Sequence, residues 1–85
     1  MEERTKHAKE CMDQGCLLYA EKQLEKAEAR LKEALSYYEA ARKNKKHFKL
    51  EIAALYKLLG DIYEIKGNRK KANLYYEISH SELES

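Results

Sequence analysis

The sequence predicts an all-α protein, and three observations support this fold class. Proline, the strongest helix breaker, is absent from the 85 residues, and the good helix formers Ala, Leu, Glu and Lys dominate the composition. Apolar residues recur at spacings of three and four along almost the whole chain, which is the period of an amphipathic helix. Because a chain of this length forms one small domain, we expect residues 1–85 to fold as a single unit.

Three interruptions of the apolar pattern divide the chain into four helices. They fall at residues 20–23, in the basic stretch 44–47, and at Gly67 with Asn68. Gly67 can adopt the left-handed conformation that closes a helix, and Lys66 before it suits the negative end of the helix dipole. The expected helices span residues 3–19, 24–43, 48–66 and 69–81.

Packing features distinguish the later helices. The helix at 24–43 carries one apolar stripe over about 30 Å, formed by Leu24, Ala27, Leu31, Ala34, Tyr38 and Ala41. In the helix at 48–66, Gly60 has no Cβ atom, so a neighbouring helix can approach closely, and Ala72 is the matching small residue. Tyr63 and Tyr76 are expected to fill the wedge between the last two helices, with their hydroxyls at its edge.

The two halves of the chain are related by an internal repeat with an offset of 45 residues. Gly15 corresponds to Gly60, and Ala27 corresponds to Ala72. Three more positions follow the same offset, with Leu18, Leu31 and Ala34 corresponding to Tyr63, Tyr76 and Ser79. A repeated helix-turn-helix unit is the signature of a helical repeat protein.

On these residues the chain resembles the tetratricopeptide repeat (TPR) family over nearly its whole length. The second copy, residues 48–83, follows the family pattern at Tyr56, Leu59, Gly60, Tyr63, Gly67, Ala72 and Tyr76. The first copy, residues 3–43, is degenerate, because Cys11, Gln14 and Lys22 stand where an aromatic residue, a leucine and a glycine are usual. The resemblance implies two stacked hairpins in a short right-handed solenoid. Relatives with lengthened helices occur in motor-adaptor and cell-polarity scaffolds and in bacterial peptide-sensing regulators, and the sequence leaves this choice open.

In TPR proteins the first helix of each pair lines a concave groove that holds an extended peptide or a partner helix. Carried over by position, the resemblance implies a groove lined by Lys9, Met12, Cys16, Tyr19, Lys57, Asp61, Glu64 and Ile65. A clamp for acidic C-terminal chaperone peptides is not expected, because Met12 and Cys16 stand where it needs Lys and Asn. As an alternative, Lys57, Asp61 and Glu64 form only a charge ladder along a solvated helix face.

Charge and cysteine usage argue against several other classes of partner. With 17 basic and 15 acidic residues, the net charge of +2 is too even to indicate nucleic acid or a membrane surface. No apolar run approaches the roughly 20 residues that span a bilayer. The side chains of Cys11 and Cys16 diverge by about 140° on one helix, so they should not bridge, and a reducing cytoplasmic location is expected.

The chain shows no recognisable catalytic or metal-binding motif. His7 and Cys11 lie one turn apart, but no further ligand completes a zinc site, so no metal or cofactor is expected and Cys11 is interpreted as a core residue. Without a phosphate-binding loop or a nucleophile motif, the chain is not expected to be an enzyme. A solvated loop, or alternatively a contact with nucleic acid or an acidic partner, is expected for Arg42, Lys43, Lys45, Lys46, His47 and Lys49.

The sequence therefore predicts a non-enzymatic interaction module that binds a peptide or helix of another protein. The alternative hypothesis is a segment of a larger TPR scaffold or of a bacterial peptide-sensing regulator, with a structural role or a role in self-association. Leu74 and Ile78 replace Ala29 and Glu33 of the first copy. The last helix is therefore expected to present an apolar surface for self-association, as in a homodimer, or for a further helix. As an alternative, Leu74 and Ile78 are only scattered apolar residues of the surface.

Overall fold

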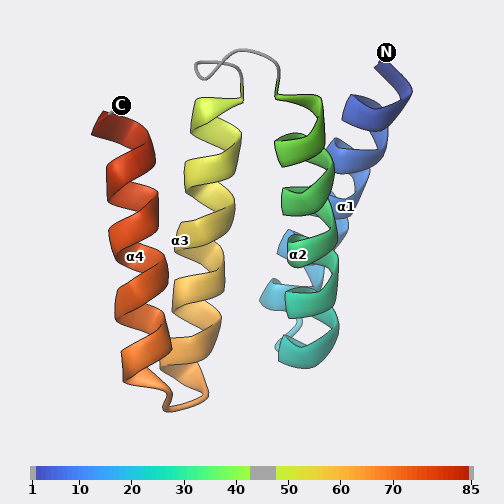
Figure 1. Ribbon diagram of the computed structural model, residues 1–85. Helices are drawn as coiled ribbons and strands as arrows, with labels where there is room; N and C mark the ends of the chain where they lie inside the picture. Colours follow the sequence, from blue (N-terminus) through green and yellow to red (C-terminus); the bar gives the residue numbers. More distant parts are fainter. Residues whose placement is uncertain (1, 43–47, 85) are drawn as a thin grey trace.

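The computed structural model describes residues 2–42 and 48–84, and these residues form four helices and no strand. The helices are α1 (Glu2–Ala20), α2 (Leu24–Ala41), α3 (Lys49–Ile65) and α4 (Arg69–Glu84). α1 packs against α2 and α3 packs against α4, and contacts between α2 and α3 join the two hairpins (Figure 1). The prediction of an all-α fold built from two antiparallel helix hairpins is confirmed.

Both hairpin turns lie at one end of the molecule, and the two chain ends marked in Figure 1 lie at the other. Each hairpin reverses the chain once, so the N-terminal ends of α2 and α4 both point toward the turn end. In the same view α1 lies behind α2, on the side away from α4. The hairpins are therefore joined through α2 and α3.

Two helix boundaries differ by more than one residue from those expected. α2 ends at Ala41 with Arg42 as its C-cap, and Lys43 lies outside the described residues. α4 continues to Glu84, beyond the expected end at residue 81. The extension is favoured because no helix breaker follows Ser81 and because Glu82 accepts a hydrogen bond of 2.9 Å from Arg42 of α2.

The two hairpin turns have the same backbone geometry, although their sequences differ. Lys22 and Gly67, which are related by the 45-residue offset, both adopt the left-handed conformation, with φ of 65° and 87°. In each turn the next residue donates a backbone hydrogen bond five residues back, from Gln23 to Leu18 (2.9 Å) and from Asn68 to Tyr63 (2.8 Å). This is the Schellman motif, in which a left-handed residue closes the helix. The degenerate first copy therefore keeps the turn without its glycine.

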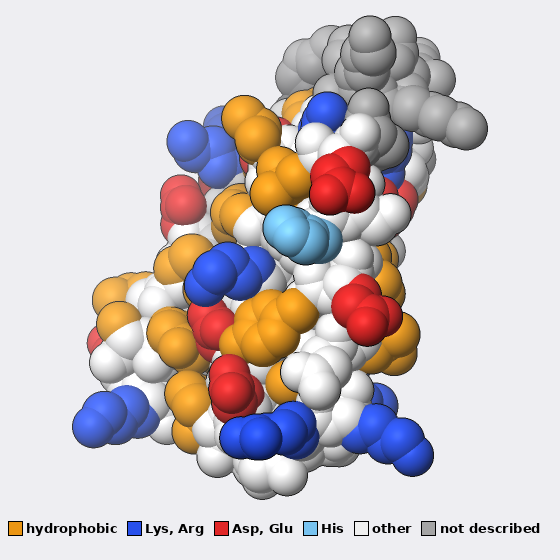
Figure 2. Space-filling model, turned by 90° about the vertical axis from the view of Figure 1, so that its left-hand side faces the viewer, with side chains coloured by type: hydrophobic (Ala, Val, Ile, Leu, Met, Phe, Trp, Pro, Cys, Tyr) orange, Lys and Arg blue, Asp and Glu red, His pale blue; other side chains and the backbone are white. Residues whose placement is uncertain are grey.

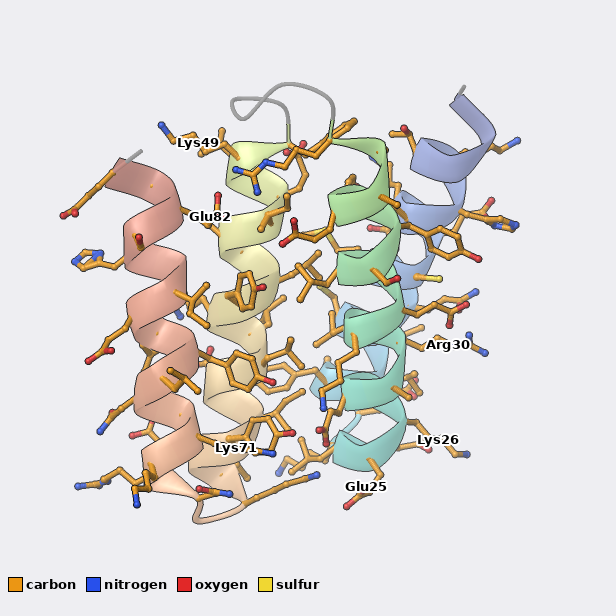
Figure 3. The ribbon with its side chains drawn as sticks, in the orientation of Figure 1. Glu25, Lys26, Arg30, Lys49, Lys71 and Glu82 are labelled. Carbon is orange, nitrogen blue, oxygen red and sulfur yellow. The ribbon has the colours of Figure 1, made fainter. Side chains whose placement is uncertain are left out.

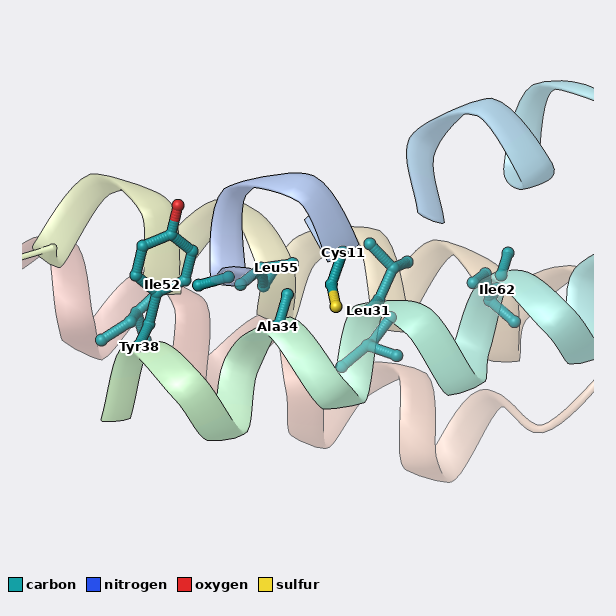
Figure 4. Packing of buried hydrophobic residues seen from close by; sticks show 10 residues of the cluster. Cys11, Leu31, Ala34, Tyr38, Ile52, Leu55 and Ile62 are labelled. Carbon is teal, nitrogen blue, oxygen red and sulfur yellow. The ribbon is translucent and has the colours of Figure 1, made fainter. Parts of the chain in front are cut away.

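The core is shared between the two hairpins. α1, α2 and α3 contribute to one buried cluster, which Figure 4 shows from close by. Its largest fully buried side chains are Leu31, Ile52, Leu55, Leu59 and Ile62. Cys11 is 7% exposed and belongs to this cluster, where its thiol acts as a small apolar group. α4 is fixed to α3 by the buried Ser79, whose hydroxyl donates to the carbonyl of Ala53 at 2.8 Å.

Candidate functional site

The α1 half of the predicted groove contains both exposed and partly buried side chains. Lys9 and Cys16 are exposed, whereas Met12 and Tyr19 are partly buried against the core. Burial, followed by the nearby charge of Asp13, raises the pKa of the Cys16 thiol. The thiol is therefore protonated at neutral pH and adds an uncharged surface between Lys9 and Tyr19.

The α3 half of the groove is ordered by contacts with α4. Lys57 pairs with Asp61 at 3.3 Å, as the charge-ladder interpretation expects. The hydroxyl of Tyr76 donates to Asp61 and also to Glu64, at 2.9 Å for the second bond. The hydrogen bond to Asp61 is the main cause that raises the pKa of Tyr76 well above its ordinary value, and the bond to Glu64 raises the pKa further. Ile65 has no such support and is 59% exposed.

The two halves lie on helices that do not pack closely against each other. α1 contacts α2, and α2 contacts α3, but α1 is not among the helices that pack closely with α3. The structure therefore gathers Lys57, Asp61 and Glu64 around the Tyr76 hydroxyl. It shows no direct bond between this group and the α1 residues in the described part of the chain.

Sequence reasoning missed a polar cluster that links the two hairpins at their turn end. One carboxylate, that of Glu28 on α2, accepts from Lys66 at 2.7 Å, pairs with Lys32 at 3.0 Å and receives the Tyr63 hydroxyl. Burial raises the pKa of Glu28, but hydrogen bonds from Lys66, Tyr63 and Lys32 outweigh it and lower the pKa to about 2. The spacing of Glu28 and Lys32 predicts their ion pair within α2, but not their contact with α3.

A tyrosine stack lies beside this cluster. Tyr75 of α4 stacks on Tyr63, with ring centroids 5.4 Å apart, and on Tyr56, at 5.9 Å. Only Tyr56 and Tyr63 follow the repeat pattern, so Tyr75 could not be identified from it. The three rings fix α4 against α3 on the side that faces α2, because Tyr63 also binds Glu28 of α2.

A second link between the hairpins lies at the opposite end. Arg42, at the C-terminal end of α2, donates to both carboxylate oxygens of Glu82 of α4, at 2.9 and 3.2 Å (Figure 3 labels Glu82). Both side chains are less than one fifth exposed, at 16% and 18%. Arg42 is therefore a bound residue rather than part of a solvated loop. Of the other basic residues of that segment, Lys49 is the first residue of α3, whereas Lys43, Lys45, Lys46 and His47 lie outside the described residues.

The described residues offer no metal cluster and no membrane span. No group of three or more His, Cys, Asp or Glu side chains is placed to hold a metal ion in residues 2–42 and 48–84. His7 instead stacks on Tyr37, at 5.7 Å between ring centroids. Over the same residues, none of the helices combines the length and the apolar character needed to cross a bilayer. Cys11 and Cys16 are both free.

Comparison of the chain with protein-family models, curated proteins and solved structures finds no match.

Proposed function

We propose that this protein is a non-enzymatic interaction module of two TPR-like hairpins, which binds a peptide or helix of a partner protein on the face formed by α1 and α3. The proposal includes a cytoplasmic location, because both cysteines are free and neither is placed to bridge the other. The binding face combines the exposed Ile65 and Cys16 with Lys9, Lys57 and the fixed carboxylate of Asp61. Apolar area with a few oriented polar groups is the usual composition of a peptide-binding surface.

One observation carries this proposal over the alternative of a segment from a longer stack. Four residues of the first hairpin are partly buried against the shared core, namely Met12, Tyr19, Leu24 and Leu35. Their counterparts 45 residues later are all exposed and charged or titratable, namely Lys57, Glu64, Arg69 and His80. The second hairpin therefore lacks four of the apolar residues that the first hairpin packs against the core.

The same contrast holds at the outer side of the first hairpin. The core residues Ile52, Leu55 and Leu59 of α3 correspond to His7, Glu10 and Gln14 of α1, and these three are exposed. Leu17, which corresponds to the core residue Ile62, is an exception, because it is apolar although 60% exposed. Capping repeats carry polar outer faces of this kind. The pattern supports a closed pair of hairpins that meets its partner through the α1 and α3 face.

A peptide selection tests the proposal. Peptides are selected from a displayed random library on the wild-type chain, and the best binder is titrated by calorimetry against a double variant, Lys57→Glu with Ile65→Ser. We expect the affinity to fall by about tenfold or more without a change in melting temperature, because both side chains are exposed.

A matched control makes the same chemical changes away from the proposed face. Lys26→Glu with Leu17→Ser reverses one exposed cation and removes one exposed apolar side chain. This variant should bind the selected peptide as the wild type does. An equal loss of peptide affinity in the two double variants would place the binding surface elsewhere. So would an unchanged affinity in the variant Lys57→Glu with Ile65→Ser.

A further inference from the structure

The first turn of α4 carries three consecutive basic residues, Arg69, Lys70 and Lys71, and no acidic residue. All three are exposed, and within the described residues none of them forms an ion pair with a carboxylate. Positive side chains are unfavourable at this end of a helix, because the helix dipole is itself positive there. The corresponding turn of α2 has Glu25 at the position of Lys70. The fold alone therefore does not account for these cations.

Two more lysines approach the same place from other helices. The ammonium groups of Lys71, Lys66 and Lys32 lie 5.1, 5.6 and 5.7 Å from the centroid of the Tyr63 ring. Figure 3 shows Lys71 at the turn end of the molecule. We call these five residues, Lys32, Lys66, Arg69, Lys70 and Lys71, the basic edge.

The carboxylates around the basic edge neutralise only part of its charge. Glu28 binds Lys32 and Lys66, and Glu25 pairs with Lys66 at 3.3 Å. Both of these carboxylates therefore pair with Lys32 or Lys66 and not with the cations of α4. The three cations of α4 have no such carboxylate partner among the described residues, and in Figure 2 the lowest charged side chains on the α4 face are Lys and Arg.

A shallow hollow on the outer side of α4 adjoins these cations. Its lining residues are Asn68, Lys70, Lys71, Asn73, Leu74 and Glu77. Leu74 is 52% exposed and supplies the apolar part of the hollow, whereas Lys70 and Lys71 supply two positive charges against the one negative charge of Glu77. A ligand that fits this surface carries several negative charges and at least one apolar side chain.

We propose that the basic edge is a second docking surface, which binds an acidic segment of a partner protein with an apolar side chain seated against Leu74. Charge complementarity and the neighbouring apolar hollow favour a peptide. Nucleic acid is disfavoured because base stacking needs an accessible ring. Here Tyr63 is 7% exposed, and Tyr75 is stacked between Tyr63 and Tyr56. The proposal is independent of the α1 and α3 face.

Titration of a fluorescent oligoglutamate peptide tests the proposal, by anisotropy at low and at physiological ionic strength. The double variant Lys70→Glu with Lys71→Glu should lower the affinity by about tenfold or more. Its fold should be at least as stable as that of the wild type, because acidic residues are favourable in the first turn of a helix. Thermal melting of the variant therefore separates loss of the surface from loss of the fold.

The control variant, Lys6→Glu with Lys26→Glu, makes the same change in net charge on α1 and α2, and both residues are exposed. It should bind oligoglutamate within about twofold of the wild type at physiological ionic strength, because exposed charges beyond a Debye length are screened. Equal loss in the two double variants, or no binding by the wild type, would overturn the proposal. So would tighter binding of a single-stranded oligonucleotide or of anionic lipid vesicles than of oligoglutamate, with the same dependence on Lys70 and Lys71.

Discussion

The ring of Tyr76 occupies the space that a side chain at Gly60 would fill. A Cβ atom on Gly60 would lie 2.7 Å from Cε1 of Tyr76 and 3.2 Å from the backbone oxygen of Ala72. Leu31 takes the same place over Gly15, where a Cβ atom would lie 2.6 Å from its Cδ2. Each hairpin is therefore closed by one large side chain of its second helix packed over one glycine of its first.

This packing predicts that Gly60→Leu destabilises the protein by about 1–3 kcal/mol, because Tyr76 must move and the backbone of Ala72 cannot easily follow. Gly67→Leu should cost less, since nothing lies within 4 Å of a Cβ atom there and only the left-handed backbone opposes the change. Chemical denaturation of both variants measures the difference. Small and equal losses would show that the α3 and α4 backbones are farther apart than described.

The two turns predict opposite effects of a reciprocal exchange. Lys22→Gly should stabilise the protein by about 0.5–1 kcal/mol, because glycine adopts the left-handed conformation without the steric cost that lysine carries. Gly67→Lys should destabilise it by a similar amount. Melting temperatures of the two single variants and of the double exchange provide the measurement. A Lys22→Gly variant that melts below the wild type would contradict the assigned turn.

The Glu28 cluster predicts a loss of stability in acid. The folded-state pKa of Glu28, about 2, lies below the ordinary value of about 4.3 for an unfolded chain. Its contribution is therefore complete above about pH 5 and is lost as the pH falls toward about 2; the shift corresponds to an upper limit of about 3 kcal/mol. Urea denaturation at several pH values should show a flatter profile for Glu28→Gln.

Glu33→Gln is the control for this acid dependence, because Glu33 pairs with Arg30 on an exposed surface, at 43% and 48% exposure. Its profile should follow that of the wild type, since exposed ion pairs contribute little. A Glu28→Gln profile as steep as the wild-type profile would assign the acid sensitivity to other carboxylates.

The bidentate contact of Arg42 with Glu82 predicts coupling between α2 and α4. A double-mutant cycle with Arg42→Met and Glu82→Gln should give an interaction energy of about 1–2 kcal/mol, because both groups are charged and mostly buried. Chemical denaturation of the four proteins measures this energy. Strictly additive effects would show that the two side chains act independently.

Self-association through Leu74 and Ile78 stays a prediction, and Leu74 is the residue that we now expect to form the contact. Leu74 is 52% exposed, whereas Ile78 is partly buried. Sedimentation over a wide range of concentrations should show a weak dimer that Leu74→Gln abolishes without changing the melting temperature. Sedimentation that does not vary with concentration in the wild type would remove the role of this residue as a dimer contact.

The helices and their pairing could be predicted because local signals specify them. The apolar period places all four helices, and Gly67 marks the turn between α3 and α4. The extension of α4 to Glu84 could not be predicted, because its partner Arg42 follows another helix, in a segment whose basic residues predict a solvated loop. Lys22 gave no turn signal of its own, and only the 45-residue offset relates it to Gly67.

Part of the candidate site was also beyond the sequence. Spacing along one helix places Lys57 beside Asp61, but the hydroxyl of Tyr76 that orients Asp61 comes from α4. The contact of Glu28 with Tyr63 likewise depends on how α2 meets α3. Periodicity describes a single helix, whereas these bonds depend on the relative rotation of two helices, which no local pattern specifies.

The position of the Arg42 and Glu82 contact has a mechanical consequence. It lies near the end of the molecule where α1 begins and α4 ends, whereas the Glu28 cluster lies at the turn end. A force applied between the two chain ends would therefore load the contact of Arg42 with Glu82 first. The remaining contacts would then break one after another toward the turns. Single-molecule extension should show a low rupture force for the first unfolding step. The variant Arg42→Met should lower this force further, whereas Glu28→Gln should leave it unchanged.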